Sequence, residues 1–171
     1  GIGGRPVAAP PKVDLFRDTG VRYLGYTNEL GEAFKAFIAR RVYLGSYVVA
    51  SGYCVGDAAS RAWESRESGA GPAEVFDTAT EAVMWQGLAS VAIPGLVINR
   101  VVAGYTRAAT AAAPKLPYMM ARVPPSVQAT VVGLACIPLI ITPIDRAVDA
   151  LIDATYRPAA DLALEYLNHP P

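Results

Sequence analysis

Acidic residues are missing from a long central part of this chain. No Asp or Glu occurs between Glu81 and Asp145, although the chain holds 15 acidic and 15 basic residues in total. The interval contains four basic residues, which are Arg100, Arg107, Lys115 and Arg122. Basic residues gathered between two apolar runs are typical of a membrane protein that marks one side of a bilayer. The net charge of zero therefore hides an uneven distribution along the chain.

Histidine and cysteine are also scarce. His169 is the only histidine and lies in a Pro-flanked tail, and Cys54 and Cys136 are the only cysteines. No catalytic or metal-binding constellation can be built around a single histidine, and the two cysteines lack the spacing of a metal or redox motif. We therefore expect a protein that is not an enzyme, with no metal and no cofactor.

Charged side chains are absent from two long apolar runs, residues 82–99 and 123–144. A helix rises about 1.5 Å per residue and the hydrocarbon layer is about 30 Å thick, so about 20 apolar residues can cross it. Each run is therefore a candidate membrane span. A soluble helical protein, the alternative class, requires helices with polar outward faces, and these runs offer none.

A third, weaker candidate span lies between Arg41 and Asp57, where glycine and serine interrupt the apolar residues. If helices cross at 42–59, 82–99 and 123–144, one side of the membrane carries 11 Lys and Arg with four acidic residues. The other side carries four Lys and Arg with 11 acidic residues, when Asp57 is counted with the loop that it borders. Since the basic side faces the matrix or cytoplasm, the N-terminus and the 100–122 loop should lie there.

The sequence thus predicts an all-α membrane protein with a three-helix transmembrane domain at residues 42–153. An extended Gly/Pro-rich arm occupies 1–13, and an amphipathic interfacial helix occupies 14–41, with Leu30 and Phe34 on its apolar face. Packing of that helix on a partner protein is an equally good interpretation. A short C-terminal helix and tail follow at 154–171.

Small residues form one stripe of the first predicted span. Gly45, Gly52 and Gly56 recur at helical spacing, and the last two form a G-x-x-x-G pair. Small residues at this spacing allow close approach of a second helix in lipid. We expect them to serve packing against the second or third span rather than a contact with another protein.

Prolines interrupt the other two predicted spans. Pro94 lies in the second, and Pro138 and Pro143 lie in the third, so we expect helix kinks at these positions. Kinked helices occur in transporters. Because no acidic or basic residue lies at the middle of the predicted spans, the sequence argues against a transport path.

Charged residues near the span ends suggest pairings. Arg100 should find Glu29 or Glu32 of the interfacial helix, or a lipid phosphate. A ridge of acidic residues follows the third span at four-residue intervals, formed by Asp145, Asp149 and Asp153. We expect this ridge to be solvated or to face arginine, with a cation site as the alternative.

Several segments together resemble the mitochondrial fission process protein family. They are residues 17–34, 85–94, 98–100, 137–138 and 143–149. The resemblance covers about residues 14–153 in the same order. It implies a non-enzymatic, multi-pass protein of the mitochondrial inner membrane, linked to mitochondrial division and inner-membrane integrity. The N-terminus is then expected in the matrix and the C-terminus in the intermembrane space. A start at Gly1 fits a trimmed import sequence or a start outside the given sequence.

Two functional hypotheses follow from these observations. Gly- and Pro-rich tails such as residues 1–4 and 169–171 fray unless a neighbouring surface holds them. A small three-helix protein offers little such surface by itself, so ordered tails would favour a structural accessory subunit of a respiratory complex or ATP synthase. The alternative is a free-standing regulator of mitochondrial fission. Expected partners are membrane lipids and other inner-membrane subunits, with no nucleic acid. Phospholipid such as cardiolipin should bind the basic residues at the membrane edge, namely Arg40, Arg41, Arg100 and Arg107.

Overall fold

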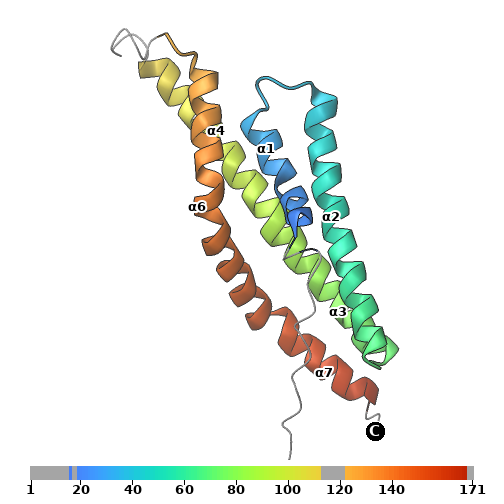
Figure 1. Cartoon of the computed structure of the whole chain (residues 1–171). Helices are drawn as coiled ribbons and strands as arrows, with labels where there is room; N and C mark the ends of the chain where they lie inside the picture. The colour runs from blue at the N-terminus through green and yellow to red at the C-terminus, as the bar shows by residue number, and fades with distance from the viewer. Residues whose placement is uncertain (1–15, 17–18, 113–121, 169–171) are drawn as a thin grey trace, which may run out of the picture.

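The computed structural model describes residue 16, residues 19–112 and residues 122–168. All secondary-structure elements within these ranges are helical (Figure 1). They are the 3₁₀ helix η1 (Gly20–Tyr26), α1 (Thr27–Ala33), α2 (Arg40–Glu67), α3 (Pro72–Gln86), the π-helix η2 (Gly87–Ala92), α4 (Ile93–Ala112), α6 (Pro125–Ala154) and α7 (Tyr156–Asn168). The predicted arm at 1–13 and the end of the C-terminal tail lie outside the described residues.

Two long helical rods dominate the structure. The elements α3, η2 and α4 follow one another without interruption, and α6 leads into α7. Within the described part of the chain, these rods are the two helices long and apolar enough to cross a membrane, at Pro72–Ala112 and Pro125–Leu167. The predicted spans at 82–99 and 123–144 lie largely inside them, so the two strongest sequence signals correspond to candidate spans.

The third predicted span lies within α2, which is not among the candidate membrane helices. The first half of α2 alternates apolar residues with Tyr43, Ser46 and Tyr47, and Asp57 is buried in the second half of the helix. These polar groups lower the mean hydropathy of the helix below that of the two rods. The structure therefore supports two candidate spans, and three are not shown.

The predicted continuous helix at 14–41 is wrong in extent. The structure has η1, then the seven residues of α1, then turns at residues 34–38 before α2 begins at Arg40. Instead of lying apart from the bundle, α1 contacts α2, α4 and α6. Figure 1 shows α1 between α2 and the α4–α6 pair. Its polar side faces these neighbours, whereas Leu30 and Phe34 are exposed.

Glycines at the contact points allow α1 to pack closely against α2, α4 and α6. A Cβ added at Gly31 would collide with the Ser46 hydroxyl of α2. A Cβ added at Gly95 of α4 would lie 2.9 Å from the Tyr47 hydroxyl oxygen, and Gly133 of α6 is similarly crowded. The close contacts of the bundle thus depend on glycines outside the predicted stripe.

The glycines of the predicted stripe have different surroundings. An added Cβ at Gly45 or Gly52 would meet no atom within 4 Å, and Gly52 is exposed. An added Cβ at Gly56 would lie 3.0 Å from the ring of Phe16. Within the described residues, this stripe does not bring α2 against another long helix.

The three prolines have different local settings. Pro94 is the second residue of α4 and directly follows the π-helix, in which the Ile93 amide bonds to the Leu88 carbonyl five residues earlier. In a π-helix each amide bonds to the carbonyl five residues earlier instead of four. The carbonyl that lacks an amide partner near Pro94 therefore differs from the one expected in a regular α-helix. Pro138 and Pro143 lie inside the continuous helix α6, which curves along its length in Figure 1.

The apolar core lies where η2 meets α6. Four buried side chains form it, which are Ala89, Ile144, Val148 and Ile152. Partly buried Trp85 and Leu88 pack against this cluster. This cluster joins the two rods at this point.

Candidate functional site

Polar side chains are buried around α1. Asn28, Glu29 and Glu32 have exposed fractions of 0%, 1% and 3%, and Asp57 and Gln86 are also buried. Burial of a charge or an amide costs free energy unless a partner compensates for the lost water. A buried polar group whose hydrogen bonds are made by other helices serves the fold. A buried polar group that lacks a partner is a candidate for ligand binding.

Glu32 is fully engaged by neighbouring helices. The hydroxyls of Tyr43 and Tyr47 donate to its Oε1 at 2.5 and 2.7 Å, and Asn99 Nδ2 donates to its Oε2 at 2.8 Å. Lys35 Nζ lies 3.5 Å from the same Oε2. Burial by itself raises the pKa of Glu32, but these hydrogen bonds outweigh it and lower the pKa. Glu32 is thus an ionised clamp between α1, α2 and α4.

The predicted pairing of Arg100 with Glu29 or Glu32 is wrong. Asn99 reaches Glu32 instead, and among the described residues Arg100 forms no ion pair with either carboxylate. Arg100 is exposed, because it lies one residue further around α4 than the inward-facing amide. A helix turns about 100° per residue, so neighbours in sequence face different surroundings.

All four predicted lipid-binding arginines are exposed. Arg40 and Arg41 begin α2, whereas Arg100 lies in the first half of α4 and Arg107 in its second half. Figure 1 places the start of α2 and the end of α4 at the same end of the molecule. The four guanidinium groups are therefore accessible from outside the protein. Lipid binding by these groups stays a prediction.

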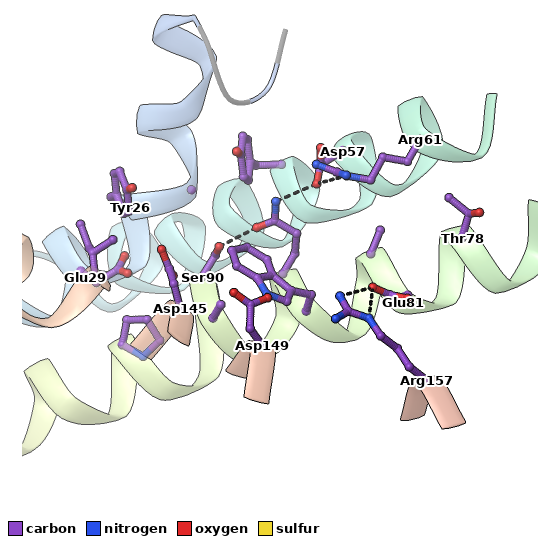
Figure 2. A pocket seen from close by; sticks show the side chains of 18 of the residues that line it. Tyr26, Glu29, Asp57, Arg61, Thr78, Glu81, Ser90, Asp145, Asp149 and Arg157 are labelled. Atoms are coloured by element: carbon purple, nitrogen blue, oxygen red, sulfur yellow. Dashed lines mark hydrogen bonds and ion pairs between the residues drawn. The ribbon is translucent and has the colours of Figure 1, made fainter. Parts of the chain in front are cut away.

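A cavity of about 600 Å³ lies beside α1, between α2, the α3–η2 segment and the α6–α7 segment (Figure 2). Six carboxylates line it, which are Glu29, Asp57, Asp77, Glu81, Asp145 and Asp149. Two guanidinium groups line it, those of Arg61 and Arg157. The lining therefore has a strong formal excess of negative charge.

A chain of hydrogen bonds crosses the floor of this cavity. Arg61 Nε donates to Asp57 Oδ2 at 3.0 Å, and Gln86 Nε2 donates to the same oxygen at 2.7 Å. Ser90 Oγ donates to Gln86 Oε1 at 2.6 Å. These contacts tie α2 to α3 and η2, and they account for the buried Asp57 within the predicted first span.

At the other end of the cavity, α7 is tied to α3 by polar contacts. Arg157 donates to Glu81 Oε1 at 2.7 and 3.0 Å and also pairs with Asp153. The Tyr156 hydroxyl donates to Asp77 Oδ1 at 2.7 Å. The bend between α6 and α7 is thus held in place by side chains of both helices.

The predicted acidic ridge on α6 splits between these settings. Asp153 faces Arg157, and Asp149 accepts a hydrogen bond from Trp85 Nε1 at 2.8 Å. Asp145 lines the cavity. Asp149 and Asp153 are both exposed, and Asp153 faces Arg157, so the prediction of a solvated or arginine-facing ridge is confirmed for these two members.

Glu29 differs from the other described carboxylates of the cavity in one buried oxygen atom that lacks a hydrogen-bond partner. Its Oε2 is inaccessible to solvent and has no hydrogen-bond partner. Burial raises the pKa of Glu29 to about 8. Figure 2 shows its side chain beside Ser90 and Asp145. Asn28, its neighbour, donates to the Val91 carbonyl of the π-helix at 3.1 Å.

Charged groups therefore lie beside the second predicted span, although the span itself has none. Glu29 lines a cavity together with Ser90 and Pro94, and Glu32 contacts Asn99. The sequence argument against charge at this depth considered only the spans, and it missed carboxylates that α1 brings from outside. The described residues hold no group of three His, Cys, Asp or Glu that could bind a metal ion.

Comparisons with known proteins identify the relatives of this chain. A family model described as Mitochondrial 18 KDa protein (MTP18) matches residues 12–83. Mitochondrial fission process protein 1 of Homo sapiens is 44% identical over 148 residues, covering 84% of this chain and 86% of that protein. The Danio rerio protein of the same name is 41% identical, covering 85% and 87%.

The similarity extends to invertebrates. Mitochondrial fission process protein 1 of Caenorhabditis elegans is 38% identical over 157 residues, covering 89% of this chain and 92% of that protein. No solved structure matches the chain. The resemblance found in the sequence is confirmed, and the chain belongs to the mitochondrial fission process protein 1 family.

Proposed function

We propose that this chain is a non-catalytic integral protein of the mitochondrial inner membrane that regulates mitochondrial fission. The observation that carries the proposal is 44% identity to mitochondrial fission process protein 1 across 84% of the chain. The two apolar rods support membrane integration. The relatives' names give no support to the other hypothesis, an accessory subunit of a respiratory complex or ATP synthase, and we do not adopt it.

Removal of the protein tests this function directly. Cells that lack it should show fewer mitochondrial division events per hour, and the wild-type chain should restore the rate. A native gel in mild detergent serves as the control for the rejected hypothesis. Unchanged division, together with co-migration of the chain with a respiratory complex or ATP synthase, would reverse our choice.

We further propose that α2 is a third membrane span. A helix of 28 residues is about 42 Å long, which exceeds the hydrocarbon thickness. Its apolar residues Val48 and Val55 are 71% and 62% exposed, whereas Tyr47 and Asp57 turn towards the other helices. Apolar groups outside and polar groups inside is the pattern expected of a helix that faces lipid. The basic end of α2 then faces the matrix.

Cysteine labelling tests the topology. In a chain without Cys54 and Cys136, single cysteines at Ala36 and Ser68 mark the two sides of α2, and both positions are exposed. In mitoplasts, an impermeant maleimide should label the cysteine at Ser68 and spare the one at Ala36. Equal labelling of both would show that α2 does not cross the membrane.

We also propose that the basic end of the molecule contacts anionic lipid. Its four arginines are Arg40, Arg41, Arg100 and Arg107, and juxtamembrane basic residues contribute about 1 kcal/mol each near an anionic surface. Replacement of all four by Gln should reduce co-purified cardiolipin. Arg66→Gln, at the other end of α2, is the matched control and should leave cardiolipin unchanged. Equal cardiolipin in both variants would contradict the proposal.

A further inference from the structure

Among the residues that the structure describes, carboxylates outnumber cationic groups in the lining of the cavity beside α1. Each guanidinium group already engages a carboxylate, since Arg61 pairs with Asp57 and Arg157 pairs with Glu81. Six carboxylates face two guanidinium groups in the lining. A cavity with this excess attracts cations and repels anions.

Glu29 supplies the specific reason to expect a bound cation. Its side chain lines the cavity, is 1% exposed and has an oxygen without a hydrogen-bond partner. A buried carboxylate is stabilised by an opposite charge that also donates hydrogen bonds. Glu32, one helical turn away, shows how the same fold satisfies a carboxylate when donors are present.

The shape of the site argues against a metal ion. The described residues contain no group of three potential ligands close enough to hold a metal. Figure 2 shows Glu29 and Asp145 towards one end of the lining and Glu81 towards the other. Carboxylates spread along a cavity match a ligand whose positive charges are also spread along its length.

The remaining lining matches an aliphatic chain that carries ammonium groups. Ala82, Ala89 and Ile141 present apolar surface between the carboxylates. Trp85 and Tyr26 present aromatic rings, which attract alkylammonium groups. A volume of about 600 Å³ is in the usual range of small-molecule sites.

We propose that this cavity binds a linear aliphatic polyamine, with one terminal ammonium group donating to Glu29 and the methylene segments lying against Ala89 and Ile141. The ethanolamine headgroup of a phospholipid has the same ammonium chemistry with a single charge. It would engage only one end of the cavity. The proposal concerns a ligand and does not depend on the role in fission.

Binding to the full-length protein tests the proposal. The protein is reconstituted in phosphatidylcholine nanodiscs, and spermine binding is measured by isothermal titration calorimetry. At pH 8.5, where the Glu29 carboxylate is ionised, spermine should bind, and Glu29→Gln should weaken it by about tenfold or more, because the variant removes the charge that the ammonium group meets. Glu165→Gln removes an exposed carboxylate of α7 outside the cavity, so it should bind like the wild type.

Further measurements distinguish the ligand from its competitors. Putrescine, with two charges, should bind more weakly than spermine, and Mg²⁺ should not displace spermine at equal concentration. Equal losses in Glu29→Gln and Glu165→Gln, or displacement by Mg²⁺, would reduce the effect to general counterion binding and overturn the proposal. If phosphatidylethanolamine nanodiscs abolish spermine binding to the wild type, the headgroup is the occupant instead.

A second variant guards against a folding defect in the first. Asp145→Asn changes another cavity carboxylate, from α6 rather than α1. It should also weaken spermine binding while its thermal unfolding midpoint stays near that of the wild type. Wild-type affinity in a folded Asp145→Asn variant would contradict a site that extends from α1 to α6.

Discussion

Glu29 and Glu32 lie three residues apart in α1, are equally buried and have opposite surroundings. Glu32 accepts hydrogen bonds from two tyrosines and an asparagine, and its pKa is lowered. Glu29 has an unpartnered oxygen, and burial raises its pKa to about 8. The same helix thus carries one carboxylate that holds the bundle together and one that lines a cavity. We infer that the first serves the fold and the second serves a ligand.

Removal of the Glu32 carboxylate should have the largest effect. Glu32→Ala leaves three partly buried donors without their acceptor, those of Tyr43, Tyr47 and Asn99. At about 1 to 3 kcal/mol for each of these three groups, the free energy of unfolding should fall by about 3 to 9 kcal/mol. Thermal or denaturant unfolding in detergent measures the loss. Glu165→Ala is the exposed control, and an equal loss in both would remove the distinction between the two carboxylates.

The pH dependence of stability should sharpen the contrast at Glu29. Its pKa rises from 4.5 to about 8 on folding, so the unfolded chain releases this proton first. The stability that Glu29 contributes is complete below pH 4.5, declines as the pH rises towards 8 and is constant above that. The decline should be on the order of 5 kcal/mol, because each pKa unit corresponds to about 1.4 kcal/mol.

Comparison with Glu29→Gln isolates this effect. Asp57 and Asp145 line the same cavity and stay in both proteins, so their titration largely cancels in the difference. The variant should be more stable than the wild type at pH 8.5, and the advantage should vanish towards pH 4.5. A difference that stays constant over this range would mean that Glu29 titrates normally in the fold.

A glycine of α4 offers an indirect way to disturb Glu32. A Cβ at Gly95 would lie 2.9 Å from the Tyr47 hydroxyl and 3.2 Å from Asn28 Nδ2, so Gly95→Ala should push Tyr47 away from the carboxylate. Overpacking of this kind costs about 1 to 3 kcal/mol. Unfolding midpoints measure the loss.

Gly45→Ala is the matched control, because an added Cβ there meets no atom within 4 Å. In a helix interior, Ala is favoured over Gly by about 0.5 to 1 kcal/mol, so this variant should be neutral or slightly more stable. If Gly45→Ala destabilises the protein as much as Gly95→Ala, the predicted stripe has a packing role that the described residues do not reveal.

The sequence predicted the two rods because hydropathy is a property of a contiguous segment. Runs without charge at 82–99 and 123–144 need no knowledge of neighbours to be recognised. The position of α1 required that knowledge. The sequence pattern places Leu30 of α1 and the adjacent Phe34 on an apolar face, but the pattern does not say which side of the helix meets the other helices. In the structure the carboxylates turn inward.

The packing glycines and the cavity also depend on contacts between residues far apart in the sequence, so the sequence did not predict them. Spacing within one helix drew attention to Gly52 and Gly56, whereas Gly31 and Gly95 matter through contacts with residues far away in sequence. The cavity collects side chains from most of the elements, so no local motif could predict it. The available signal was the pair Glu29 and Glu32, one helical turn apart in the segment that precedes the first predicted span.

Loss of a single hydroxyl should give the smallest effect and tests how the Glu32 contacts are shared. Tyr47→Phe removes one donor at 2.7 Å and leaves those of Tyr43 and Asn99, so the cost should be about 1.5 kcal/mol, the lower value for a bond to a charged group. Tyr53→Phe removes a hydroxyl that donates to the Phe16 carbonyl at 2.9 Å, a neutral acceptor. It should cost less, about 1 kcal/mol. If the two variants are equally stable in denaturant titrations, the charge of Glu32 adds nothing to its contacts. The contrast with Glu29 would then concern only the number of donors and not the ionisation state.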